Sequence, residues 1–178
     1  MKSNYLRLGF TSLSSVIFLL FTLFLQAEGE PVKSHFTRTN VETPSNAADV
    51  RTVSKRAVRD FQKSYPAVSS PNWYHTQDGG WLAIFDDGSI RTVVAYNRAG
   101  SLNHTIRYYD ESKLPKEVRK IAKSTYYDFS INRVANIILP EVRAEEVYLV
   151  YMESKSELKV VTISASEIVD VKTYQKGG

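Results

Sequence analysis

The sequence predicts an α+β fold, in which two tandem units of one helix and four strands form one antiparallel sheet of about eight strands with the helices packed on one face. Two observations predict this fold. Apolar residues recur at helical spacing in two short segments, and each segment is followed by four apolar runs of strand length that polar or glycine-bearing turns separate. Since an antiparallel meander commonly buries only one of its faces, we expect both helices on that face.

Residues 1–27 have the layout of a secretory signal peptide. Lys2 and Arg7 provide a cationic start, residues 16–25 are almost entirely apolar, and Ala27 is a small residue suited to a cleavage site. We therefore expect a secreted or periplasmic protein that is cleaved near Ala27 and does not insert into the membrane after cleavage. An uncleaved N-terminal anchor is the alternative.

The predicted domain follows a polar stretch. Residues 28–50 contain two prolines and show little apolar periodicity, which predicts a flexible linker. An N-terminal tail without a role is the alternative interpretation. The domain is expected over residues 51–178, with the first unit at about 52–110 and the second at about 111–178.

The composition excludes several classes of function. The chain contains no cysteine, which excludes disulfides, a thiol nucleophile and a lipid-modified cysteine. Removal of the signal peptide takes Lys2 and Arg7 away, which brings the 23 basic residues of the chain close to its 19 acidic residues. This near-balance of charge removes the electrostatic argument for a nucleic-acid partner.

The first predicted helix lies within SKRAVRDFQKSYP, residues 54–66, where Ser54 can cap the start and Pro66 ends the helix. Its apolar residues recur at helical spacing: Ala57, Val58, Phe61 and Tyr65. Four strands are predicted after this helix: Asn72–Gln77, Trp81–Phe85, Ile90–Tyr96 and Leu102–Tyr109.

The second predicted helix begins after Leu114, because Pro115 is favourable in the first turn. Its shared face carries Val118, Ile121, Ala122 and Thr125. Four more strands are predicted after it: Ile131–Leu139, Val147–Glu153, Leu158–Ile163 and Ile168–Tyr174. Both units end in an aromatic-bearing strand, IRYYD in the first and VKTYQ in the second.

Two acidic residues beside a glycine, Asp86, Asp87 and Gly88, raise the question of a cation site or a catalytic carboxylate pair. A calcium loop requires oxygen ligands at alternate positions and a closing glutamate, which the residues after Gly88 do not provide. Paired catalytic carboxylates lie across a substrate in contrasting environments. Asp-Gly between apolar runs is instead a strong hairpin signal, since glycine tolerates positive φ. We therefore predict a turn.

The other polar residues form no recognisable catalytic, cofactor or metal motif. The histidines, His35, His75 and His104, lack zinc-ligand spacing, so we predict solvated side chains. No nucleophile elbow and no phosphate loop occurs in the sequence. The glycosylation pattern at Asn103 is interpreted as chance. We predict a non-enzymatic protein without cofactor or metal; an enzyme with Asp86 or His104 as general base would need a deep cavity.

Large side chains on the predicted strands are candidate partner-binding residues. The candidates are Trp73, Trp81, Tyr148 and Met152. If the helices cover one face of the sheet, some of these residues must line the other, where exposed aromatic side chains favour docking of a protein or peptide. We expect two or three to be exposed. The alternative is that they fill the core.

Four stretches of this chain, AVRDFQKSYP, NWYHTQDGGWLAIFDDGSIRTVVAYNRAGSL, LPKEVRKIA and VYLVYMES, together resemble one family. From about Val53 to Tyr174 the chain is similar to periplasmic PepSY-like domains related to β-lactamase-inhibitor proteins (BLIP). The resemblance implies a secreted, non-enzymatic module with two α/β repeats and a concave sheet, which grips a partner protein in the inhibitors. No stretch matches an inhibitory loop, and the disulfides of the inhibitors are absent, so no inhibitory residue is assigned.

The leading hypothesis is therefore an exported, non-catalytic module that docks an envelope or secreted protein or peptide through an aromatic-bearing sheet face. The alternative is a sensor of a small molecule or envelope polysaccharide, with a pocket between helix and sheet in which Trp73 or Trp81 stacks on a sugar ring. A pocket lined by these tryptophans would favour the sensor, and a filled core would contradict it.

Overall fold

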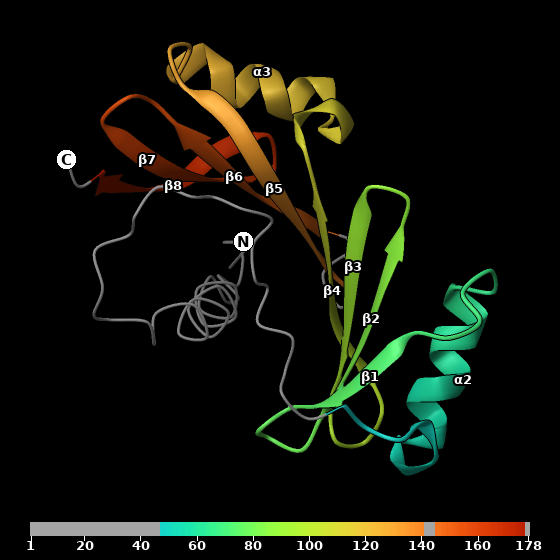
Figure 1. Ribbon diagram of the computed structural model, residues 1–178. Helices are drawn as coiled ribbons and strands as arrows, with labels where there is room; N and C mark the ends of the chain where they lie inside the picture. The colour runs from blue at the N-terminus through green and yellow to red at the C-terminus, as the bar shows by residue number, and fades with distance from the viewer. Residues whose placement is uncertain (1–46, 141–144, 177–178) are drawn as a thin grey trace, which may run out of the picture. The chain divides into compact units, whose positions relative to one another are not determined.

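The computed structural model describes residues 47–140 and 145–176, which all belong to one unit of the chain (Figure 1). Within them, a 3-10 turn η1 (Val50–Thr52), helix α2 (Lys55–Ser64) and four strands come first: β1 (Asn72–His75), β2 (Trp81–Asp87), β3 (Ile90–Tyr96) and β4 (Leu102–Tyr109). A second turn η2 (Glu111–Lys113), helix α3 (Lys116–Thr125) and four further strands follow: β5 (Ser130–Leu139), β6 (Glu145–Glu153), β7 (Glu157–Ser164) and β8 (Glu167–Gln175). The predicted signal peptide lies outside the described residues.

The strands form one antiparallel sheet of 8 strands in the order of the sequence, which confirms the predicted α+β class (Figure 1). Strand β1 ends at His75, two residues before the predicted end at Gln77. The chain turns there because the Thr76 amide donates to the Gly80 carbonyl at 3.1 Å and the Thr76 hydroxyl donates to Asp78. The next strand consequently starts directly after Gly80.

The stretch with two aspartates is a hairpin turn, as predicted. Asp86 and Asp87 are the exposed last residues of β2, and Asp87 lies opposite Ile90 of β3. Gly88 and Ser89 therefore form a two-residue connection, in which Gly88 has a φ of 59°. This positive φ is the conformation for which glycine is favoured at the first position of such a turn.

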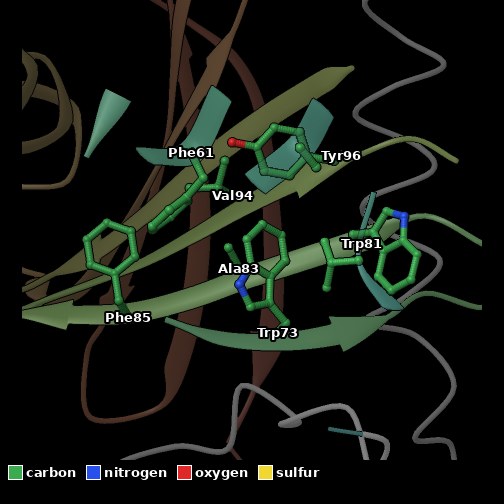
Figure 2. Close-up of a cluster of buried hydrophobic side chains, with 9 residues drawn as sticks. Phe61, Trp73, Trp81, Ala83, Phe85, Val94 and Tyr96 are labelled. Carbon is green, nitrogen blue, oxygen red and sulfur yellow. The ribbon is translucent and has the colours of Figure 1, made fainter. Parts of the chain in front are cut away.

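The first hydrophobic core lies between α2 and strands β1 to β3 (Figure 2). Phe61 of α2 is 2% exposed, and its ring meets Trp73 and Phe85 edge-on at centroid distances of 5.6 Å each. Edge-to-face aromatic pairs of this kind stabilise a core beyond their buried area. Tyr96 of β3 also belongs to this core, and its hydroxyl donates a hydrogen bond to the Asp60 carboxylate of α2 at 3.0 Å, which links the helix to the sheet.

The second core lies between α3 and strands β5 to β7, and its members are Leu114, Ala122, Phe129, Ile131, Val134, Val150, Met152, Val161 and Ile163.

The two helices end with the same hydrogen-bond pattern. The amide of Tyr65 donates to the Phe61 carbonyl at 2.8 Å, and the amide of Tyr126 donates to the Ala122 carbonyl at 3.0 Å.

Both helices pack on the same face of the sheet. Val94 of the first core lies opposite Thr105, and Thr105 lies opposite Ile138. Residues directly opposite each other in neighbouring strands point to the same side of the sheet, and so do residues two apart in one strand. Ile138 therefore points to the same side as Val94. Val134 of the second core, four residues before Ile138 in β5, points to that side as well. We call this side the helix face and the opposite side the distal face.

The described residues begin within the predicted linker. Ala47 forms an antiparallel bridge with Tyr74, and the Ala48 amide donates to the Trp73 carbonyl at 2.8 Å. These residues therefore continue the sheet beyond β1. Ser54 occupies the predicted N-cap position of α2, but its side chain makes no capping hydrogen bond. Among the described residues, neither helix has the length and apolar character needed to cross a membrane.

Candidate docking face

The structure places the four predicted binding residues on the helix face rather than on the distal face. Trp73 and Trp81 are 5% and 8% exposed in the first core, and Met152 is 1% exposed in the second. Tyr148 is half-buried and packs against the second core. The expectation that two or three of them are exposed is wrong, because α2 and α3 cover the face to which strand alternation points these side chains.

The distal face carries a different group of large side chains. We call it the tyrosine–arginine cluster; it consists of Arg91 on β3, Tyr108 on β4, Arg133 on β5, Tyr151 on β6 and Tyr174 on β8. Arg91 lies opposite Tyr108, and Arg133 lies opposite Tyr151. The two arginines and two of the tyrosines are half-buried, whereas Tyr174 is 44% exposed.

Electrostatic interactions show that the members of the cluster are near one another. Burial raises the pKa of Tyr108, and the guanidinium groups of Arg133 and Arg91 oppose this shift. Burial raises the pKa of Tyr151 to about 12. The neighbouring phenols of Tyr108 and Tyr174 add to this increase, and Arg133 opposes it. The phenols of Tyr108 and Tyr151 therefore stay protonated at neutral pH and can both donate and accept hydrogen bonds.

Arg91 is the least satisfied member of the cluster. Its Nε is buried and makes no hydrogen bond in the described structure. Asp86 lies directly opposite on β2 but is exposed, and the ion pairs between described residues do not include Arg91. Buried polar atoms are normally paired in native proteins, so an unpaired guanidinium nitrogen requires an explanation.

The histidines are not brought together. His75 of β1 packs against Trp81 on the helix face, with ring centroids 3.9 Å apart and the rings tilted by 43°, whereas His104 of β4 is on the distal face. His104 is half-buried rather than solvated, contrary to expectation, and burial lowers its pKa. His35 lies outside the described residues. Within the described ranges, no three histidine, aspartate or glutamate side chains are grouped to hold a metal ion.

A groove of about 330 Å³ lies between α3 and the turn that joins β7 to β8. We call it the α3 groove; its lining residues are Glu117, Val118, Ile121, Glu146, Tyr148, Ile163, Ser164, Ala165 and Ser166. Glu146 accepts a hydrogen bond from the Asn136 amide at 3.2 Å and another from the Tyr148 hydroxyl. Burial and this bond to Glu146 raise the pKa of Tyr148.

The backbone of this turn is unusual. Ala165 and Ser166 have φ values of 49° and 65°, a left-handed conformation that normally favours glycine or asparagine.

The tryptophans do not line the α3 groove, because they are packed in the first core. The sugar-stacking pocket expected for a sensor is therefore absent at Trp73 and Trp81, where the structure has a filled core.

No protein-family model and no curated protein matches the chain. Solved structures with a similar fold include a DUF2874 family protein from Bacteroides ovatus (15% identity, TM-score 0.59, covering 71% of this chain and 89% of that chain). They also include a BLIP-like protein from Bacteroides fragilis (16% identity, TM-score 0.58, covering 71% of this chain and 89% of that chain). A third is a protein from Bacteroides eggerthii that is provisionally named periplasmic (12% identity, TM-score 0.57, covering 68% of this chain and 88% of that chain). The chain has a BLIP-like fold.

Sequence identity of this order supports the fold and assigns no functional site. Sequence reasoning missed the tyrosine–arginine cluster, although a signal for it existed. The predicted terminal strands of both units, IRYYD and VKTYQ, contain Tyr108 and Tyr174. Their strand parity places these residues on the face opposite to the helices, once that face is known.

Proposed function

We propose that the protein is an exported, non-catalytic binding module that docks a protein or peptide through the distal face of its sheet. The observation that carries this proposal is the tyrosine–arginine cluster, which gathers three tyrosines and two arginines from five strands on a face that neither α2 nor α3 covers. Tyrosine and arginine are enriched among the residues that dominate binding energy at protein interfaces.

The chemistry of the cluster suits docking better than catalysis. Each tyrosine side chain offers a large apolar ring and one hydroxyl, which allows it to pack against a partner and still satisfy a polar group. The centre of the distal face supports these rings with apolar residues: Ile84, Val93, Ile106, Ala135, Ile137 and Val147. A rigid sheet of this kind presents its side chains with little loss of conformational entropy on binding.

The same proposal includes the location of the protein, its relation to a family and the origin of its repeated elements. The location is the periplasm, which the signal-like N-terminus favours. The relation to PepSY-like domains rests on the resemblance of the four stretches. A tandem repeat of the helix–four-strand unit accounts for the repeated order of elements and for the matching ends of α2 and α3.

Substitution of the cluster should abolish docking without unfolding the domain. The test compares the full chain with a Tyr151→Ala/Tyr174→Ala variant, each used as bait in envelope extract. Loss of hot-spot tyrosines should weaken capture of a given partner at least about thirtyfold. Tyr127→Ala is the matched control, since Tyr127 is 79% exposed after α3 and outside the distal face.

Urea unfolding establishes that each bait is folded. If the double variant is unstable, Tyr174→Arg replaces it, because this residue is exposed and the substitution adds like charge to the cluster. A partner that binds wild type and control but not the cluster variant supports the proposal. Equal capture by all folded baits contradicts it.

A second candidate function, sensing of a small molecule, is favoured by the α3 groove. Its floor is apolar and two carboxylates, Glu117 and Glu146, line it. Neither carboxylate forms an ion pair with a described residue. Apolar surface between two carboxylates that lack an ion-pair partner among the described residues suits an aliphatic diamine, and the volume is near the lower limit for small-molecule sites.

This candidate predicts that 1,5-diaminopentane binds the protein in isothermal titration calorimetry and that 1,5-pentanediol does not. A Glu117→Gln/Glu146→Gln variant should bind the diamine at least about tenfold more weakly, because the two attractive charges are removed. Asp170→Asn, an exposed site on β8 away from the groove, should leave the affinity unchanged. Equal heats from diamine and diol would rule this function out.

A further inference from the structure

We propose that strand β8 is a self-association site, at which two copies of this chain join their sheets edge to edge in antiparallel orientation. This inference goes beyond the proposed docking function and does not depend on it. Strand β8 ends the sheet, and within the part of the chain that the structure describes it pairs only with β7. An edge strand presents backbone N–H and C=O groups that can pair with another chain.

The hydrogen bonds to β7 show which backbone groups of β8 point away from the sheet. The Lys176 amide donates to the Ser156 carbonyl, in the turn before β7, at 2.8 Å. In an antiparallel pair, residues that bond to the neighbouring strand alternate with residues whose N–H and C=O groups point away from it. Since Lys176 bonds inward, the outward groups of the strand before it belong to Val171, Thr173 and Gln175.

A bulge limits the part of β8 that can pair on its outer side. Thr162 of β7 lies opposite Asp170, and the next residue, Ile163, lies opposite Ile168, so Val169 is an extra residue in β8. A bulge bends its strand and disrupts regular pairing. Regular pairing with a second copy is therefore confined to residues 170–176.

One antiparallel register pairs the three outward residues only with one another. It places Thr173 opposite Thr173 of the second copy, and Val171 opposite Gln175 of the second copy. Each of these pairs can exchange two backbone hydrogen bonds. A two-fold axis nearer the start of β8 would place Val169 of the bulge opposite an outward residue, so the bulge favours the axis at Thr173.

The charges along β8 are self-complementary in this register. Asp170 lies opposite Lys176 of the second copy, and the two-fold symmetry repeats this pair. Asp170 is exposed and forms no ion pair with a described residue. The Lys176 ammonium donates to Glu153 at 3.1 Å and to the Ser154 carbonyl at 2.6 Å, and it has a third donor. Opposite charges across two strands stabilise their pairing, which favours a second copy over an unrelated strand.

Pairing of this kind extends the distal face. Directly opposite residues of paired strands point to the same side, so the distal faces of both copies lie on one side of the joined sheet. One strand pair is smaller than a standard stable interface. We therefore expect a reversible dimer with a Kd of about 100 μM.

Sedimentation equilibrium on protein purified from cells that express the full chain, from about 10 μM to about 1 mM, measures this association. Thr173→Pro removes an outward N–H that β7 does not use, a position at which an edge strand tolerates proline. Thr173→Ala is the matched control, because it also loses the hydroxyl that accepts from Lys159 at 3.0 Å but keeps the N–H. We expect Thr173→Pro to weaken dimerisation at least about tenfold and Thr173→Ala to change it by less than about twofold.

Two charge variants test the register independently of the proline. Asp170→Lys and Lys176→Asp each place like charges opposite one another in a dimer of identical copies, so each alone should dimerise at least about tenfold more weakly. In an equimolar mixture of the two variants, both cross-strand contacts join opposite charges. The mixture should therefore regain the wild-type affinity to within about threefold.

Circular dichroism establishes that each variant is folded, and if Thr173→Pro is not, the charge variants decide. Recovery of the dimer in the mixture supports the inference. A wild type that stays monomeric at every concentration overturns it, as does a mixture that stays monomeric. Equal weakening by folded Thr173→Pro and Thr173→Ala would also overturn it, because the backbone N–H would then have no part in the contact.

Discussion

Replacement of Trp73 by alanine is expected to lower the free energy of unfolding by about 3–5 kcal/mol. Trp73 is 5% exposed, and its ring contacts Phe61 of α2 and Tyr96 of β3 at centroid distances of 5.6 and 6.0 Å. Removal of the indole leaves a cavity between helix and sheet that these neighbours cannot fill without moving. Domains of this size are stable by only about 5–15 kcal/mol, so the loss is a large part of the total.

Urea unfolding followed by circular dichroism measures this change. Tyr127→Ala is the control, because Tyr127 is 79% exposed and its removal should alter the free energy by no more than about 0.5 kcal/mol. A Trp73→Ala variant as stable as wild type would place Trp73 outside the core. In that case the original assignment of this residue to partner binding would regain its basis.

Gly100→Ala is the second substitution with a large expected effect, a loss of about 2–5 kcal/mol from strain and overpacking together. Gly100 lies in the turn between β3 and β4 and has a φ of 79°, which disfavours any L-residue with a side chain. A Cβ at this position would lie 2.3 Å from the Ser54 Oγ and 3.0 Å from the Ala57 amide nitrogen. The turn therefore touches the first turn of α2, and a methyl group would force the two apart.

Gly88→Ala separates the two contributions. Gly88 also has a positive φ, 59°, but a Cβ there would meet no atom within 4 Å. This variant should lose only the cost of the left-handed conformation, about 1 kcal/mol. Equal losses for both glycine variants in urea unfolding would show that the contact between the β3–β4 turn and α2 has no energetic weight.

These two substitutions bear on function as well as stability. The tryptophans and the Gly100 contact hold α2 on the helix face, and this placement leaves the distal face to the tyrosine–arginine cluster. Changes in the first core should therefore reduce partner capture only in proportion to unfolding. Changes in the cluster should reduce it in a folded protein, which distinguishes a docking residue from a core residue.

The secondary-structure elements and their order could be predicted from local sequence patterns. Helical spacing in residues 54–66 and 115–125 and alternation in the strands are local patterns, so they predicted both helices and every strand within a few residues. The Asp-Gly turn was equally predictable, because the positive φ of Gly88 depends on the residue itself and not on distant contacts.

Which large side chains lie on the face that the helices leave uncovered depends on tertiary packing and could not be read from the sequence. Strand β6 is apolar on both of its sides, so alternation could not tell the buried face from the other. The choice followed when α2 and α3 packed on the side of Trp73 and Met152 and left Tyr108 and Tyr151 opposite. Arg91 of β3 and Arg133 of β5 likewise act on the same residue, Tyr108 of β4, because the order of strands in the sheet places β4 between β3 and β5.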